Sequence, residues 1–215
     1  MRKNKFKLQE QINRINELAG VNAAAGKHLC VVDIQPEYES GFSYFLGDFI
    51  NFLNENYEHL ANLTFFYNGY DSLGMISESD YKWWWIENGL EHYIVDQATF
   101  YDKGYAFFRY CIDEGIEDEE IVNLIKYMIE KNVNDSRDLD KDFWNEYVER
   151  FGDENIRGLL EFAGDSLNIP DLMDELRNYN GIVLCGGGVN ECLKEVEIAL
   201  QALDKPFNII TKYTY

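Results

Sequence analysis

The chain has few positively charged residues. Its 215 residues include 19 lysines and arginines against 39 aspartates and glutamates, which gives a formal net charge of −20 at pH 7. Nucleic-acid-binding proteins usually present a basic face, so this balance argues against nucleic acid as a partner. The one basic cluster consists of Arg2, Lys3, Lys5 and Lys7. We interpret residues 1–20 as an N-terminal amphipathic helix that packs on the domain or a partner subunit, or alternatively as a detachable leader.

Long apolar runs, internal repeats and low-complexity tracts are also missing. No stretch approaches the roughly 20 apolar residues that a membrane helix needs, and no signal-peptide pattern follows the N-terminus. The sequence therefore predicts a soluble, cytoplasmic protein with no membrane partner. Because 46% of the residues are apolar, the chain can bury a full core, and its length favours a single α/β domain over residues 1–215.

Cysteine and histidine are scarce and scattered. The four cysteines, Cys30, Cys111, Cys185 and Cys192, form no CxxC pair and no Cys/His cluster, and two of them lie in or beside runs typical of buried strands. This usage favours reduced thiols over a disulfide framework and argues against a structural zinc site. We expect no metal and no cofactor.

The remaining pattern alternates strands with helices. Strands are predicted at 29–34, 63–67, 93–100, 182–185 and 207–211, and helices at 42–56, 79–87, 119–131, 141–151, 155–162, 171–177 and 190–203. This alternation predicts an α/β fold, a parallel sheet with helices on both faces. The charged stretch 116–168 is longer than one crossover requires, so we interpret it as a helical insertion and a possible lid.

Candidate functional residues follow the predicted strands. In open parallel sheets, ligands bind beyond the carboxyl ends of the strands. Asp33 and Gln35 follow the first strand, Lys103 the third, and Cys192 the glycine-rich fourth. Cys192 falls in the first turn of a helix, where the helix dipole is expected to lower the pKa of a thiol. Taken singly, Asp33 is explained equally well as an acid that caps a turn. For Lys103 and Cys192 a solvated turn lysine and a small buried cysteine are the more frequent explanations, and only the combination favours a site.

Two segments resemble the isochorismatase-like cysteine hydrolases, the family that includes nicotinamidases and related amidases. The first is Val31-Val32-Asp33-Ile34-Gln35, and the second is Ile182-Val183-Leu184-Cys185-Gly186-Gly187-Gly188-Val189-Asn190-Glu191-Cys192-Leu193, running into a helix. The preceding Ile169-Pro170-Asp171-Leu172-Met173 is also similar to the family's sequences. Together these matches cover the two ends of the core. The resemblance implies a Rossmann-like, three-layer α/β fold.

The resemblance also implies an Asp–Lys–Cys triad. Asp33 would be the proton acceptor, Cys192 the nucleophile and Lys103 their electrostatic partner. Gln35 and the turn Gly188, Val189 and Asn190 would bind the substrate, with backbone N–H groups near the cysteine holding an oxyanion and a cis peptide bond within 187–190. An alternative alignment on Ala106-Phe107 places Tyr101 at the lysine position. Since no histidine follows the second strand near Asn68, a metal-dependent nicotinamidase is disfavoured.

Three functions remain open. The first is a cysteine hydrolase that acts on a small amide or related acyl compound through a thioester. The second is a catalytically inactive relative that binds a small molecule or a protein. The third takes Gly186-Gly187-Gly188 as a phosphate-binding turn, for which the fuller glycine fingerprint is missing. For either of the first two we expect a homo-oligomer.

Overall fold

The computed structural model describes residues 24–69, 75–103, 112–113, 115–131, 141–151 and 169–215. A five-stranded, all-parallel sheet with the order β3-β2-β1-β4-β5 forms its centre. The strands are β1 (His28–Val32), β2 (Asn62–Tyr67), β3 (Thr99–Asp102), β4 (Ile182–Gly186) and β5 (Phe207–Ile209). All five residues of both β1 and β4 are buried, because these strands lie inside the sheet and helices cover them.

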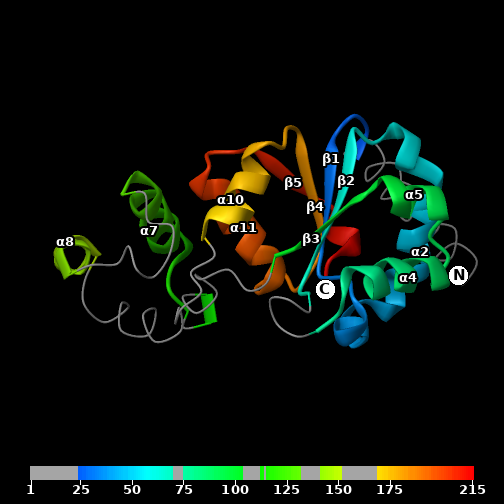
Figure 1. Cartoon of the computed structure of the whole chain (residues 1–215), viewed down its shortest axis with the longest axis horizontal. Coiled ribbons are helices and arrows are strands. Elements are labelled where there is room, and N and C mark those ends of the chain that lie inside the picture. The colour runs from blue at the N-terminus through cyan, green and yellow to red at the C-terminus, as the bar shows by residue number, and fades with distance from the viewer. Residues whose placement is uncertain (1–23, 70–74, 104–111, 114, 132–140, 152–168) are drawn as a thin grey trace, which may run out of the picture.

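Helices lie on both faces of the sheet (Figure 1). One face carries α2 (Glu39–Asn56), α4 (Glu78–Glu87) and α5 (His92–Gln97), and the other carries α10 (Ile169–Arg177) and α11 (Cys192–Ala202). Two short 3-10 helices, η1 (Pro36–Tyr38) and η2 (Tyr57–His59), flank α2, and η4 (Thr211–Tyr213) follows β5. The predicted α/β class, a parallel sheet with helices on both faces, is confirmed.

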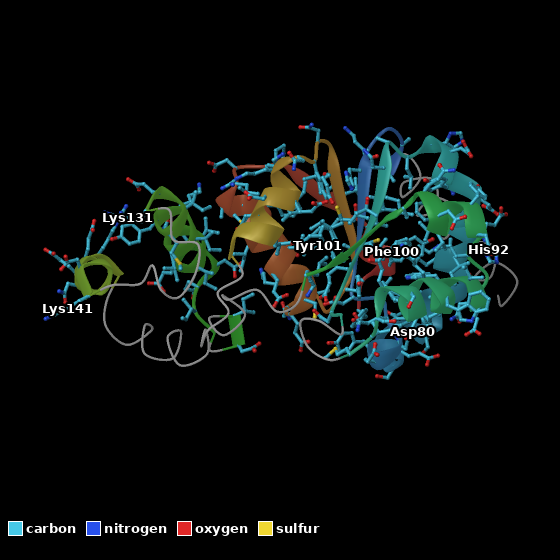
Figure 2. The ribbon with its side chains drawn as sticks, viewed as in Figure 1. Asp80, His92, Phe100, Tyr101, Lys131 and Lys141 are labelled. Atoms are coloured by element: carbon cyan, nitrogen blue, oxygen red, sulfur yellow. The ribbon has the colours of Figure 1, made fainter. Side chains whose placement is uncertain are left out.

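Each face has its own apolar core. On one side Phe42, Phe49, Phe65 and Trp85 pack together, and on the other Phe66, Leu184 and Val196 join side chains from α7 (Asp118–Glu130). Consecutive residues of a strand point to opposite faces, so Phe100 packs against Phe65 while Tyr101 packs against Phe66. Figure 2 labels Phe100 and Tyr101 on the two sides of β3.

The predicted insertion at 116–168 is described only in part. Its first helix, α7, buries five side chains and packs against α11, so it completes the helical layer on that face. A second helix, α8 (Lys141–Phe151), lies beyond α7, and Glu146 on it forms an ion pair with Lys131 (Figures 1 and 2). Residues 132–140 and 152–168, with the predicted helix 155–162, lie outside the described residues, as do the N-terminal residues 1–23.

One strand prediction is wrong over most of its length. Residues 93–100 are predicted as a strand, but the chain forms α5 first and enters β3 only at Thr99. The Glu91 carbonyl accepts hydrogen bonds from the N–H groups of Ile94 and Val95, at 3.0 and 3.3 Å, which starts the helix. Packing of Ile94 and Val95 into the core beside α4 outweighs the β propensity of these residues.

The order of the strands reverses between β1 and β4. After β1 the chain proceeds through β2 to β3 on one side, and β4 and β5 lie on the other. Such a reversal opens a crevice at the carboxyl ends of the two central strands. Asp33 follows β1 and the turn that leads to Cys192 follows β4, so both predicted residues lie at this point of the sheet.

Candidate functional site

A buried cluster of charged side chains lies at the carboxyl end of the sheet. Lys103, directly after β3, places its Nζ 3.0 Å from Oδ2 of Asp33, and neither side chain is exposed to solvent. Lys103 Nζ also lies 3.0 Å from Oε2 of Glu195, a residue of α11 whose side chain is equally inaccessible. The structure therefore brings two carboxylates and one ammonium from three separate parts of the chain into direct contact.

Asp33 has a constrained backbone. Its φ is +46°, in the left-handed region that residues other than glycine rarely adopt. The Asp33 N–H donates to the carbonyl of Phe66 at 2.9 Å, and its own carbonyl accepts from the Tyr215 hydroxyl at 3.0 Å. Strained backbone of this kind collects at functional sites, and these two hydrogen bonds hold the Asp33 carboxylate toward Lys103.

Asn68, the first residue after β2, connects Asp33 to Lys103. Its Oδ1 accepts from Lys103 Nζ at 3.1 Å, while its Nδ2 donates to Asp33 Oδ2 at 3.3 Å and to the Tyr38 hydroxyl at 3.1 Å. Because Asn68 is fully buried, these contacts fix the distance between the two charged groups. Its place directly after a strand was the signal that could have identified it from the sequence.

Gln35 holds Asn68 in place. Its Oε1 accepts from the Asn68 N–H at 2.8 Å, and its Nε2 donates to the Asn68 carbonyl at 3.4 Å and to Glu37 at 2.9 Å. Sequence reasoning assigned Gln35 to substrate binding. In the structure its amide is buried and bonds the loop after β1 to the loop after β2.

Cys192 is the first residue of α11 and is 6% exposed. The pKa of its thiol is raised to about 12, first by burial and then by the nearby Asp33 carboxylate, while the Lys103 ammonium acts in the opposite direction. The expected lowering of this pKa by the helix N-terminus is therefore wrong for this arrangement.

The same electrostatics couple all the ionisable groups of the cluster. Burial by itself lowers the pKa of Lys103, but the Asp33 and Glu195 carboxylates outweigh it and raise that pKa above its usual range. Lys103 therefore stays charged. Oδ1 of Asp33 is buried and has no hydrogen-bond partner within the described residues.

The turn before Cys192 is shaped by a glycine. Gly186 has a φ of +79°, and a Cβ at this position would lie 2.3 Å from the Val32 carbonyl oxygen. Only glycine lets the end of β4 approach β1 this closely. The resemblance implied a cis peptide bond within 187–190, and the described chain contains none.

Some of the backbone N–H groups predicted to bind an oxyanion already donate hydrogen bonds within the protein. The N–H of Val189 donates to the Tyr215 carbonyl at 2.9 Å, and the N–H groups of Glu191 and Leu193 donate to the Gly188 carbonyl at 2.9 and 3.2 Å. Val189 and Asn190 are exposed, and Val189 is 49% accessible.

The sequence analysis did not identify Glu195. It also offered Tyr101 as an alternative to Lys103 at the lysine position of the triad. Cys192 and Glu195 are three residues apart on one helix, a spacing that places both on the same face. An acid on the buried face of a helix, beside a candidate nucleophile, was the available signal. Tyr101 packs against Phe66 on the sheet, whereas Lys103 reaches Asp33.

The described ranges of the chain hold no group of three histidine, cysteine, aspartate or glutamate side chains arranged to bind a metal ion. No helix among them is long and apolar enough to cross a membrane. Comparison with protein families, with curated proteins and with solved structures finds no match for this chain.

Proposed function

We propose that the chain is a cysteine hydrolase that cleaves a small amide or related acyl compound, with Cys192 as the nucleophile. One observation carries the proposal: Asp33, Lys103 and Cys192, from distant parts of the chain, meet in one buried cluster at the topological switch point. An acid, an ammonium and a thiol are the groups that such chemistry needs. They are also the triad that the resemblance to isochorismatase-like hydrolases implies.

The reaction begins with a proton transfer inside the cluster. The Cys192 S–H bond breaks and an O–H bond forms on the Asp33 carboxylate, which forms a side-chain hydrogen bond with the thiol. The transfer leaves the total charge of the cluster unchanged. The cluster can therefore form a thiolate even though the raised pKa disfavours loss of the proton to water.

The thiolate then attacks the carbonyl carbon of the bound amide. The C–S bond forms, the C–N bond breaks, and the Asp33 carboxylic acid returns its proton to the leaving nitrogen. A thioester on Cys192 remains. Asp33, again a carboxylate, accepts a proton from a water molecule whose oxygen attacks the thioester carbon. The C–S bond breaks, the acid leaves, and Asp33 returns the proton to the sulfur, which restores the thiol.

Charge limits the substrates that fit. The buried cluster contains two carboxylates and one ammonium, so a substrate that carries its own carboxylate would add a further negative charge beside it. We propose neutral or cationic amides as the substrate class. Backbone N–H groups of the turn 188–192 would hold the developing oxyanion, and the Val189 N–H would first have to release the Tyr215 carbonyl.

An ammonia-release assay tests the proposal. A panel of neutral, cationic and anionic primary amides is incubated with the wild type and with Cys192→Ala, Asp33→Asn and Lys103→Met. Activity should appear with neutral or cationic amides and disappear in Cys192→Ala. Cys185→Ala, which removes a buried thiol from neighbouring β4, is the matched control and should retain the specific activity of the folded protein.

The second candidate is an inactive relative that binds a small molecule or a protein at the same edge of the sheet. The Val189 hydrogen bond to Tyr215 and the raised pKa of Cys192 favour it. Under this alternative no amide in the panel is hydrolysed, while a binding ligand raises the melting temperature equally in the wild type and in Cys192→Ala.

A further inference from the structure

Glu195 is a fully buried acid on the nucleophile helix. It lies three residues after Cys192 on α11, and none of its side chain is exposed. Its Oε2 accepts a hydrogen bond from Lys103 Nζ at 3.0 Å. A buried carboxylate is costly unless it is paired, so this residue has a specific partner and a specific place in the cluster.

Lys103 divides its three N–H donors among three acceptors. These are Asp33 Oδ2 at 3.0 Å, Glu195 Oε2 at 3.0 Å and Asn68 Oδ1 at 3.1 Å. An ammonium group has three donors, so the three contacts fix its position. One contact comes from the loop after β1, one from the loop after β2 and one from the nucleophile helix.

The proposed reaction changes one of these contacts. When Asp33 takes the proton of Cys192, it becomes a neutral carboxylic acid and its attraction for Lys103 weakens. Glu195 does not take part in this transfer and keeps its negative charge. The ammonium then retains one full ion pair at the moment when the thiolate forms.

We propose that Glu195 is a positioning residue that serves as the lasting counter-ion of Lys103, holding the ammonium in place while Asp33 alternates between carboxylate and carboxylic acid. The inference rests on the proposed function, because only that reaction requires Asp33 to change its charge. Asp33 and Cys192 cannot serve as this constant counter-ion, because both change their charge during the proposed reaction.

The role has an electrostatic consequence at Cys192. The titratable groups that face the thiol are Asp33, Lys103, Glu195 and the Tyr215 phenol. From α7, packed on α11, Asp118 pairs with Lys194 instead. The negative charge of Glu195 opposes ionisation of the thiol, so its removal should make Cys192 easier to ionise.

Alkylation of Cys192 by iodoacetamide as a function of pH tests this role without any substrate. The variants are Glu195→Gln, which keeps a hydrogen-bond acceptor for Lys103, and Glu195→Asp, which keeps the charge. We expect Glu195→Gln to shift the rate profile down by about one pH unit, equal to roughly a tenfold faster rate at pH 8. Glu195→Asp should stay close to the wild type. Glu197→Gln, a partly buried glutamate of the same helix, is the matched control and should not shift the profile.

The proposal is overturned if Glu195→Gln superimposes on the wild type, if Glu195→Asp shifts as far as Glu195→Gln, or if Glu197→Gln shifts the profile equally. Should Glu195→Gln fail to fold, carboxyl carbon NMR on wild-type protein labelled in glutamate decides. An ionised Glu195 at pH 7 supports the proposal and a protonated one overturns it.

The two proposals fail separately. A shifted alkylation profile with no hydrolysis of any amide would overturn only the proposed function. Hydrolysis with an unshifted profile would overturn only the role of Glu195.

Discussion

The Lys103 ammonium and the Glu195 carboxylate lie 3.0 Å apart although their residues are separated by 92 positions in the chain. The pair joins the end of edge strand β3 to the helix that carries Cys192. Its two members are inaccessible to solvent, so the interaction is not screened by water as a surface ion pair is. The stability of the fold and the proposed reaction therefore depend on the same contact.

Replacement of Lys103 should destabilise the fold strongly. Lys103→Met leaves Asp33 and Glu195 as two uncompensated carboxylates in the interior, and the loss of one partner from a buried pair typically costs about 3–5 kcal/mol. Urea unfolding measures this loss. The control is Lys126→Met, which removes an exposed lysine paired with Asp204 and should change the free energy of unfolding by less than about 1 kcal/mol. Equal losses in both variants would contradict the account.

Two glycine substitutions separate close packing from backbone strain. Gly186→Ala introduces a Cβ 2.3 Å from the Val32 carbonyl oxygen at a φ of +79°, whereas Gly26→Ala meets no atom within 4 Å at a φ of +66°. We expect Gly26→Ala to cost about 1 kcal/mol, from the left-handed backbone alone. Gly186→Ala should cost clearly more, because β1 and β4 must also separate. Thermal unfolding of the two variants would refute this explanation if they lost the same stability.

His28 should make the fold sensitive to acid. Burial lowers the pKa of His28 from 6.5 to about 4 in the folded state. The unfolded chain therefore binds more protons between these values, so this contribution to stability is present above pH 6.5 and is lost as the pH falls toward 4. The loss amounts to at most about 3 kcal/mol.

A comparison of variants isolates that contribution. His28→Gln should flatten the dependence of the unfolding free energy on pH between 4 and 6.5, relative to the wild type. His59→Gln, at an exposed histidine, should leave the slope unchanged. An unaltered slope in His28→Gln would show that His28 does not produce it.

Asp33→Asn should have opposite effects on two reactions of Cys192. Asp33 raises the pKa of the thiol more than Glu195 does, so removal of its charge should let iodoacetamide alkylate Cys192 more than about tenfold faster at pH 8. The same change removes the proton acceptor, so amide hydrolysis should fall by two orders of magnitude or more, on the order of a general-base contribution. Alkylation and hydrolysis that change in the same direction would argue against this role of Asp33.

The sequence predicted the strands and helices in which apolar residues follow a regular pattern. The central strands and the long helices were identified within a few residues, because buried strands form short apolar runs and helices show a regular apolar face. Residues 93–97 were wrongly predicted as part of a strand. Their β-branched and aromatic side chains favour a strand locally, but packing beside α4 stabilises a helix.

The site was predicted in part for a related reason. Asp33, Lys103 and Cys192 all follow strands of a parallel sheet, and the topology alone brings such residues to one edge. Glu195 and Asn68 were not identified. Their positions on the helix of Cys192 and directly after β2 were signals of a role at this edge, but neither position names a distant lysine as the partner. Pairing across 92 positions becomes visible only when the strand order is known.

The most direct test of the central claim is peptide mapping by mass spectrometry after brief exposure to an activated acyl ester such as p-nitrophenyl acetate. The account predicts a thioester on Cys192, with Cys30 and Cys185 unmodified because both are fully buried. Acylation confined to surface lysines, or equal labelling of the three cysteines, would contradict the assignment of Cys192 as the nucleophile.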